Sequence, residues 1–212
     1  MIKSVLSLIA GIFFVMLATS CSAQPTSKPS RIVALGDSLT AGYGLAKGQD
    51  FASKLQNALR SEGYNVTVDN GGVSGDTTAG GLLRVDRLIN VTPKPDLVIV
   101  ELGANDMLRG VNPQIMEANL RQILRKIQEK EIPALLTGML APYQFPPVYR
   151  NAFNNVFPQL AREFNVPLYE FFLEGVALDV RYNLPDRAHP NAAGIDIIVR
   201  NILPSVRDAL AK

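Results

Sequence analysis

Arg31-Ile32-Val33-Ala34-Leu35-Gly36-Asp37-Ser38-Leu39-Thr40 is an apolar run together with the turn that follows it. An apolar run that ends in a glycine and small polar residues is typical of a strand entering a tight turn. Four more short apolar runs follow along the chain, at residues 66–68, 97–102, 134–137 and 166–169. Several are apolar on both faces, as are strands of a parallel sheet that is covered by helices on each side.

Segments of helical period separate these strands, at residues 51–60, 78–88, 115–129 and 149–164. The third carries one apolar stripe, Met116, Leu120, Ile123, Leu124 and Ile127. A last helix is expected from Asn191, with Pro204 ending or kinking it. Alternating strands and helices predict an α/β fold of three layers with a five-stranded parallel sheet. In such folds the functional site lies at the loops that follow the carboxyl ends of the strands.

The N-terminal segment has the pattern of an export signal. Lys3 precedes an apolar run at residues 5–17, and small residues follow it. The run is shorter than the roughly 20 apolar residues that a membrane-spanning helix needs, which disfavours a permanent anchor. We therefore expect a signal peptide at residues 1–21, a polar tether at residues 22–30 and one domain at residues 31–212, in an exported protein of the periplasm or the membrane surface.

Cys21 is the only cysteine of the chain, so the sequence predicts no intramolecular disulfide. Residues 17–21 resemble a bacterial lipoprotein box, in which Cys21 would become a lipidated N-terminus and associate the protein with a membrane; ordinary cleavage nearby is the alternative. The formal net charge is +2, and no dense cluster of lysine and arginine occurs. Nucleic acid is therefore not an expected partner.

Ser38 follows the first strand directly, at a place where a parallel sheet presents its functional groups. A serine needs a base to become nucleophilic, and His189 is the only histidine. Asp186 precedes His189 by three residues, so its carboxylate can accept the Nδ1 proton and leave Nε2 facing a serine. The alternatives are that Ser38 caps the next helix and that Asp186 makes only a local loop hydrogen bond.

Acyl transfer also needs hydrogen-bond donors for the oxyanion that forms on the attacked carbonyl. Two further strand-end loops can supply them. Residues 70–77 are rich in glycine, so that a backbone N–H can approach a substrate closely. In the other loop, Asn105 of residues 103–106 offers a carboxamide donor. Alternatively, Asn105 holds its own loop by bonding to the backbone.

These motifs together resemble the SGNH, or GDSL, hydrolase family. Four blocks match in order, Gly36-Asp37-Ser38-Leu39, Ser74-Gly75-Asp76-Thr77, Gly103-Ala104-Asn105-Asp106 and Asp186-Arg187-Ala188-His189. The resemblance is greatest to the bacterial acyl-CoA thioesterase, lysophospholipase and arylesterase type. It implies a flavodoxin-like sandwich, with Ser38 as nucleophile and with Asp186 and His189 as its partners. It also implies an oxyanion hole from the N–H groups of Ser38 and Gly75 and the Asn105 side chain, and no metal or cofactor.

The expected substrate is a small acyl ester or thioester. An apolar, proline-stiffened segment at residues 140–149, together with Met107 and Leu108, is expected to wall a groove for the acyl chain; otherwise these side chains only pack the loop onto the sheet. One rival function is a carbohydrate O-deacetylase, although the chain lacks the tryptophan of a typical sugar platform. The other is a non-catalytic binding domain of the cell envelope.

Overall fold

The computed structural model describes residues 29–211, which form one five-stranded, wholly parallel sheet in the order β2-β1-β3-β4-β5. The predicted signal peptide at residues 1–21, with Cys21, and residues 22–28 of the predicted tether lie outside the described part. The strands are β1 (Ser30–Gly36), β2 (Val66–Gly72), β3 (Leu97–Glu101), β4 (Ala134–Thr137) and β5 (Leu168–Tyr169). The chain places β2 on one side of β1 and then β3, β4 and β5 on the other side. The loops that follow β1 and β3 therefore lie at the switch point of the strand order, where ligands bind in such folds.

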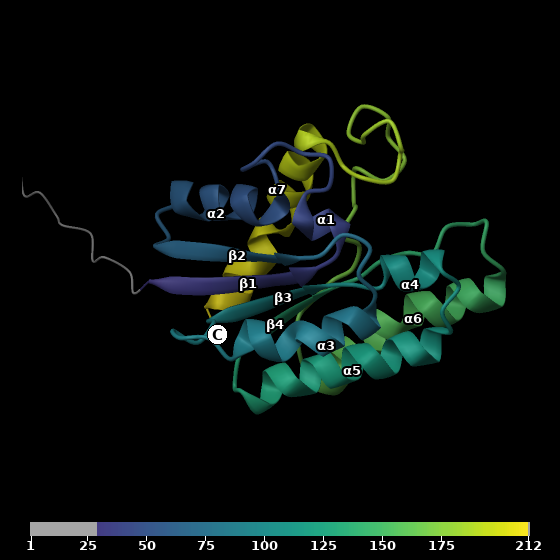
Figure 1. Cartoon of the computed structure of the whole chain (residues 1–212), viewed down its shortest axis with the longest axis horizontal. Helices are drawn as coiled ribbons and strands as arrows, with labels where there is room; N and C mark the ends of the chain where they lie inside the picture. Colours follow the sequence, from purple (N-terminus) through teal and green to yellow (C-terminus); the bar gives the residue numbers. More distant parts are fainter. Residues whose placement is uncertain (1–28, 212) are drawn as a thin grey trace, which may run out of the picture.

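Helices cover both faces of the sheet (Figure 1). One face carries α2 (Phe51–Ser61) and α7 (Ala192–Leu210), and the other carries α3 (Thr78–Ile89), α5 (Pro113–Glu129) and α6 (Pro147–Phe164). Two short helices, α1 (Ser38–Ala41) and α4 (Ala104–Leu108), lie where β1 and β3 end. The predicted three-layer α/β sandwich is therefore confirmed.

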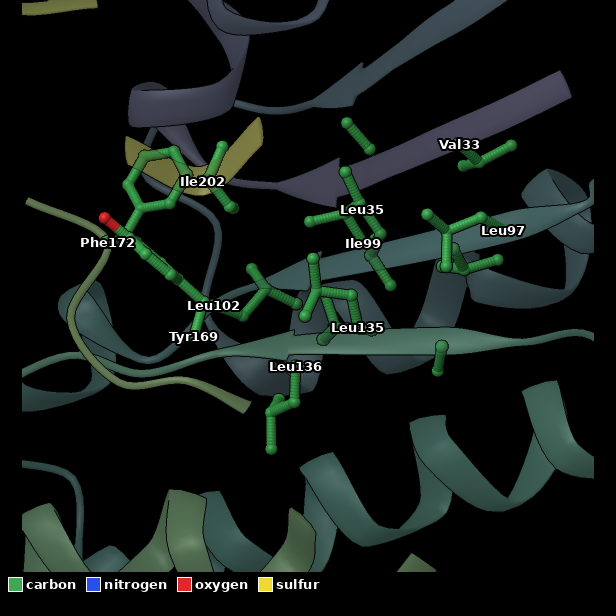
Figure 2. Packing of buried hydrophobic residues seen from close by; sticks show 14 of the residues in the cluster. Val33, Leu35, Leu97, Ile99, Leu102, Leu135, Leu136, Tyr169, Phe172 and Ile202 are labelled. Atoms are coloured by element: carbon green, nitrogen blue, oxygen red, sulfur yellow. The ribbon is translucent and has the colours of Figure 1, made fainter. Parts of the chain in front are cut away.

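The core explains why several strand runs are apolar on both faces. All five residues of β3 are buried, because helices pack against both faces of the sheet. Figure 2 shows side chains of β1, β3 and β4, among them Leu35, Ile99 and Leu135, packed together across neighbouring strands. The predicted apolar stripe of α5 is buried along its whole length. Burial of such side chains stabilises the fold by about 1.5–3 kcal/mol for each large one.

Several elements begin or end one or two residues away from the predicted positions, and four further points concern single elements. The strand β2 continues to Gly72, which pairs with Gly36, so Gly71 and Gly72 belong to the sheet and not to the loop. The last helix does not end at Pro204 but runs through it to Leu210, since a proline removes one backbone hydrogen bond and leaves the others. The strand β5 begins only at Leu168. The helices α1 and α4 were not predicted.

Within residues 29–211, no helix combines the length and the apolar character that crossing a membrane requires.

Candidate active site

Three side chains from distant parts of the sequence form one continuous line of hydrogen bonds. Ser38 is the first residue of α1, directly after β1, and the other two lie on the loop between β5 and α7. The His189 Nε2 atom lies 2.9 Å from Ser38 Oγ, and His189 Nδ1 lies 2.7 Å from Asp186 Oδ2. The fold thus brings together the three residues that the sequence singled out.

The turn before Ser38 fixes the position of its hydroxyl. Asp37 is the N-cap of α1, and its Oδ1 accepts a hydrogen bond of 2.9 Å from the backbone N–H of Leu39. The interpretation of Ser38 as a helix cap is therefore wrong, because Asp37 fills that place. Gly36 allows the turn to pack closely: a Cβ atom on it would lie 2.6 Å from Glu101 Oε2. The Ser38 hydroxyl is therefore not used for capping and can hydrogen-bond to His189.

Asp186 makes both the local hydrogen bonds and the contact with the ring. Its Oδ1 accepts from the backbone N–H groups of Ala188 and His189, each at 3.0 Å, while Oδ2 faces the imidazole. These backbone donors, with the ring, lower the pKa of Asp186 to about 2. A carboxylate at Oδ2 can only accept, so Nδ1 carries the proton and Nε2 is left to accept from Ser38.

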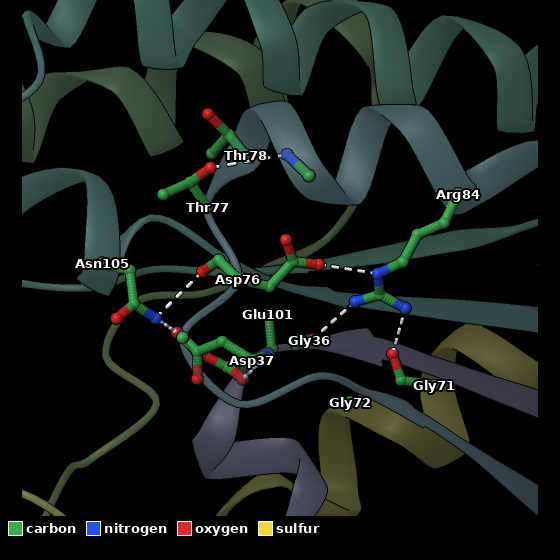
Figure 3. A network of polar contacts seen from close by, with 12 residues as sticks. Gly36, Asp37, Gly71, Gly72, Asp76, Thr77, Thr78, Arg84, Glu101 and Asn105 are labelled. Carbon is green, nitrogen blue, oxygen red and sulfur yellow. Dashed lines mark hydrogen bonds and ion pairs between the residues drawn. The ribbon is translucent and has the colours of Figure 1, made fainter.

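Asn105 is the first of three candidate oxyanion donors. It lies on α4, and its Nδ2 donates to Asp37 Oδ2 and to the carbonyl of Asp76, both at 2.9 Å (Figure 3). The side chain therefore ties together the loops after β1, β2 and β3. An oxyanion at this place would share or replace one of these two acceptors.

Gly75 and Ser38 offer backbone donors. Gly75 has a φ of +81°, a conformation that residues with a Cβ rarely adopt, and its carbonyl accepts a 2.6 Å hydrogen bond from the exposed Arg109. Ser38 begins α1, and the N–H groups of a first helical turn have no acceptor within their own helix. The position of Ser38 thus leaves its N–H without an acceptor in α1.

Several residues of the site were not anticipated from the sequence. Arg84 of α3 donates to Asp76 Oδ2 at 2.6 Å, to the Gly36 carbonyl at 2.7 Å and to the Gly71 carbonyl (Figure 3). Tyr43 packs its ring on that of His189, with 4.5 Å between centroids. Glu101 is buried at the end of β3. Of these residues, only Glu101 could have been noticed in the sequence, because it is a charged residue inside an otherwise apolar strand run.

The segment expected to wall an acyl groove is partly exposed. Leu140, Tyr143 and Val148 present their side chains to solvent, and so does Leu108, whereas Met107 packs in the core. A hollow of about 320 Å³ lies at the opposite end of the strands, beside the start of β4 and the end of α6. It contains no part of the Ser38–His189–Asp186 line.

No group of three or more histidine, cysteine, aspartate or glutamate side chains with the spacing of a metal site occurs within residues 29–211. The site described above consists of a hydroxyl, an imidazole, carboxylates and amides.

Comparison with known proteins identifies the family. The model of the GDSL-like Lipase/Acylhydrolase family matches residues 34–197, which include every residue of the site. The chain belongs to this family. Among curated members, the Esterase TesA of Pseudomonas aeruginosa is 35% identical over 203 residues, 96% of this chain and 98% of that protein. The Thioesterase 1/protease 1/lysophospholipase L1 of Escherichia coli is 36% identical over 201 residues, 95% of this chain and 88% of that protein.

Solved structures of GDSL family members have the same fold. The esterase AlinE4, described as an SGNH-hydrolase family esterase, is 44% identical and superposes with a TM-score of 0.73. The match covers 86% of this chain and 97% of that one. The flavodoxin-like strand order of the present chain is thus the fold of the family.

Proposed function

We propose that the protein is a serine hydrolase that cleaves carboxylic esters and thioesters through an acyl-serine intermediate. The observation that carries this proposal is the unbroken line from Ser38 Oγ through the His189 ring to Asp186, with distances of 2.9 Å and 2.7 Å. The names of the family relatives, esterase, arylesterase and thioesterase 1/lysophospholipase L1, support it. Ser38 is the nucleophile, His189 the general base and Asp186 the residue that orients the base.

The reaction proceeds in two halves. His189 Nε2 takes the proton of Ser38 as Oγ attacks the acyl carbonyl, and then returns it to the departing alcohol or thiol. Water, activated by the same Nε2, hydrolyses the acyl-serine. Asp186 remains ionised throughout and stabilises the imidazolium that forms in each half. The N–H groups of Ser38 and Gly75 and the carboxamide of Asn105 donate to the oxyanion in both tetrahedral species.

The acyl chain is the part of the substrate that the site recognises. Exposed apolar side chains at the end of α4 and on the loop after β4, Leu108, Leu140 and Tyr143, favour an apolar acyl group over a sugar. Rates with p-nitrophenyl acetate, butyrate and octanoate, an acyl-CoA and an acetylated xylan test this preference. Faster release of acetate from xylan than from any aryl or thiol ester would favour the carbohydrate O-deacetylase. No turnover of any substrate, with no labelling by a fluorophosphonate, would favour the non-catalytic binding domain.

Asp186→Asn is expected to lower kcat roughly 10³- to 10⁴-fold, because an amide at this place favours the wrong tautomer of His189. The side chain keeps its shape and can still accept from the N–H groups of Ala188 and His189, so the loop should persist. Initial rates over a range of pH measure the effect. In the wild type the carboxylate persists down to about pH 2, so activity lost between pH 7 and pH 4 must come from another group. A kcat within about tenfold of the wild type would contradict the orienting role.

Asn105→Ala is expected to lower kcat about 10²- to 10³-fold with little change in KM, since its hydrogen bond to the substrate oxygen strengthens as the oxyanion forms. Because Asn105 also donates to Asp37 and to Asp76, we expect stability to fall by about 1–3 kcal/mol as well. Kinetics are therefore measured well below the melting temperature, on protein shown to be folded. A normal kcat in the folded fraction would leave Asn105 as a residue that only holds its loops.

Export to the periplasm is part of the proposal and rests on the sequence of residues 1–21. If Cys21 is lipidated, Cys21→Ser should move the protein from the membrane fraction to the soluble fraction, with unchanged specific activity. Cell fractionation and the mass of the mature N-terminus measure this. Recovery of both forms in the soluble fraction would favour ordinary cleavage of the signal.

A further inference from the structure

Glu101 is a buried acid that touches the nucleophile turn and has no part in the reaction described above. It is the last residue of β3 and is 1% exposed. Its Oε2 accepts a 2.8 Å hydrogen bond from the Thr40 hydroxyl and a 3.3 Å hydrogen bond from the backbone N–H of Asp37. One carboxyl group thus holds the residue before Ser38 and the residue two positions after it.

The second oxygen of Glu101 differs from the first, because no group within residues 29–211 donates to it. Among the described residues, Oε1 is buried and has no hydrogen-bond partner. An ionised carboxylate in such a place is unfavourable, because a buried charge needs several donors or a cation. Arg84, a cation that reaches this turn, is directed to Asp76 and to the carbonyls of Gly36 and Gly71. Burial, and next the negative charge of Asp37, hold the pKa of Glu101 well above its ordinary value of 4.5.

Asp37 is the better placed of the two acids to carry a charge. Its carboxylate accepts from the N–H of Leu39 and from Asn105, each at 2.9 Å. Burial raises the pKa of Asp37 to about 6, and these two donors act against the rise. His189 favours the charge on Asp37 and Asp76 disfavours it. Two adjacent buried acids cannot both ionise easily, so the charge goes to Asp37 and the proton to Glu101.

We propose that Glu101 is a positioning residue that works as a neutral acid, fixing the turn from Asp37 to Thr40 without adding a second negative charge beside the oxyanion. This role rests on the proposed function. The turn sets the place of Ser38 Oγ, and a shift of about 1 Å in a reacting group can cost roughly 100-fold in rate. A second buried anion near Ser38 would also oppose the negative charge that develops during the attack.

Two substitutions separate the position of Glu101 from its charge. Glu101→Gln keeps the shape and a neutral acceptor, and its kcat and KM are expected to stay within about twofold of the wild type. Glu101→Leu keeps the approximate volume but removes the acceptor, and kcat is expected to fall about 10- to 100-fold at nearly constant KM. Equal losses of kcat in both variants would show that the anion is needed. An unchanged kcat in Glu101→Leu would show that Glu101 positions nothing.

If Glu101→Leu does not fold, Thr40→Val takes its place, because it removes the hydroxyl donor and nearly preserves the shape of the side chain. The Thr40→Val variant should lower kcat at nearly constant KM. Normal kinetics of Thr40→Val would overturn the positioning role.

The pH dependence of stability tests the proton on Glu101 without any enzymatic assay. Above about pH 4.5 an unfolded chain releases the proton of Glu101, whereas the folded chain keeps it, so folding becomes less favourable as the pH rises. Relative to Glu101→Gln, the unfolding constant of the wild type should therefore rise about tenfold per pH unit, until the folded carboxyl ionises. Urea unfolding from about pH 4 to about pH 8 measures this, with Glu129→Gln, an exposed residue at the end of α5, as the control.

The expected result is a difference between wild type and Glu101→Gln that widens with pH, and a Glu129→Gln curve parallel to that of the wild type. Parallel curves for the wild type and Glu101→Gln would overturn the neutral state of Glu101. Because unfolding needs no substrate, this result is independent of the proposed function, whose own failure would appear as an absence of turnover and of labelling at Ser38.

Discussion

Replacing Ser38 with alanine is expected to lower kcat for p-nitrophenyl butyrate roughly 10⁴- to 10⁶-fold while the fold persists. The alanine removes the only atom that forms the acyl-serine, so that only water can attack the bound ester. The remaining rate comes from substrate binding and the oxyanion donors, which the substitution leaves in place. Ser38 Oγ has His189 as its hydrogen-bond partner, so the melting temperature should change little.

Ser61→Ala is the matched control for this substitution. Ser61 is exposed at the end of α2, where its hydroxyl bonds to the Ala58 carbonyl. Its kinetics should equal those of the wild type. A Ser38→Ala protein that retains more than about one hundredth of the wild-type kcat would exclude Ser38 as the nucleophile.

Replacing His189 with alanine is expected to lower kcat roughly 10⁵- to 10⁶-fold, because no other imidazole exists in the chain to take the proton of Ser38. The effect should match that of Ser38→Ala, and the double variant should be no slower than either single one, since the two residues act as a unit. Initial rates of the three variants measure this. A double variant much slower than both would show that Ser38 and His189 act independently.

Tyr43→Ala serves as a comparison for the loss of His189, because it removes the ring that packs on the imidazole and leaves the imidazole itself. We expect a much smaller loss of rate than in His189→Ala. A loss as large as that of His189→Ala would show that ring packing, and not proton transfer, dominates the effect.

The regular part of the fold was predictable because its elements carry a periodic apolar pattern. The bounds of β4 agree with the prediction, and the α5 stripe predicted its buried face. The short helices α1 and α4 span four and five residues, too few for a helical period to appear in the sequence. The strand β5 begins late because Val166, which reads as strand, closes the end of α6 by donating to the Ala161 carbonyl.

The candidate site was predictable where a residue type is rare or a motif has fixed order. A single histidine left His189 no competitor, and its spacing to Asp186 indicated the pair. The supporting contacts of Arg84 and Glu101 were not predictable, because they join α3 and β3 to the turn after β1 through side-chain directions that no spacing encodes. These contacts appear only in the three-dimensional packing at the carboxyl ends of the strands.

The central claim, that Ser38 is the nucleophile, is tested most directly by labelling with a fluorophosphonate followed by mass spectrometry of the intact protein and its peptides. We expect one adduct per chain, on Ser38, formed at neutral pH and abolished in both Ser38→Ala and His189→Ala. The adduct should be absent from unfolded protein, where His189 no longer lies beside Ser38. Labelling that persists in Ser38→Ala, or that falls on another residue of the native protein, would exclude Ser38 as the nucleophile.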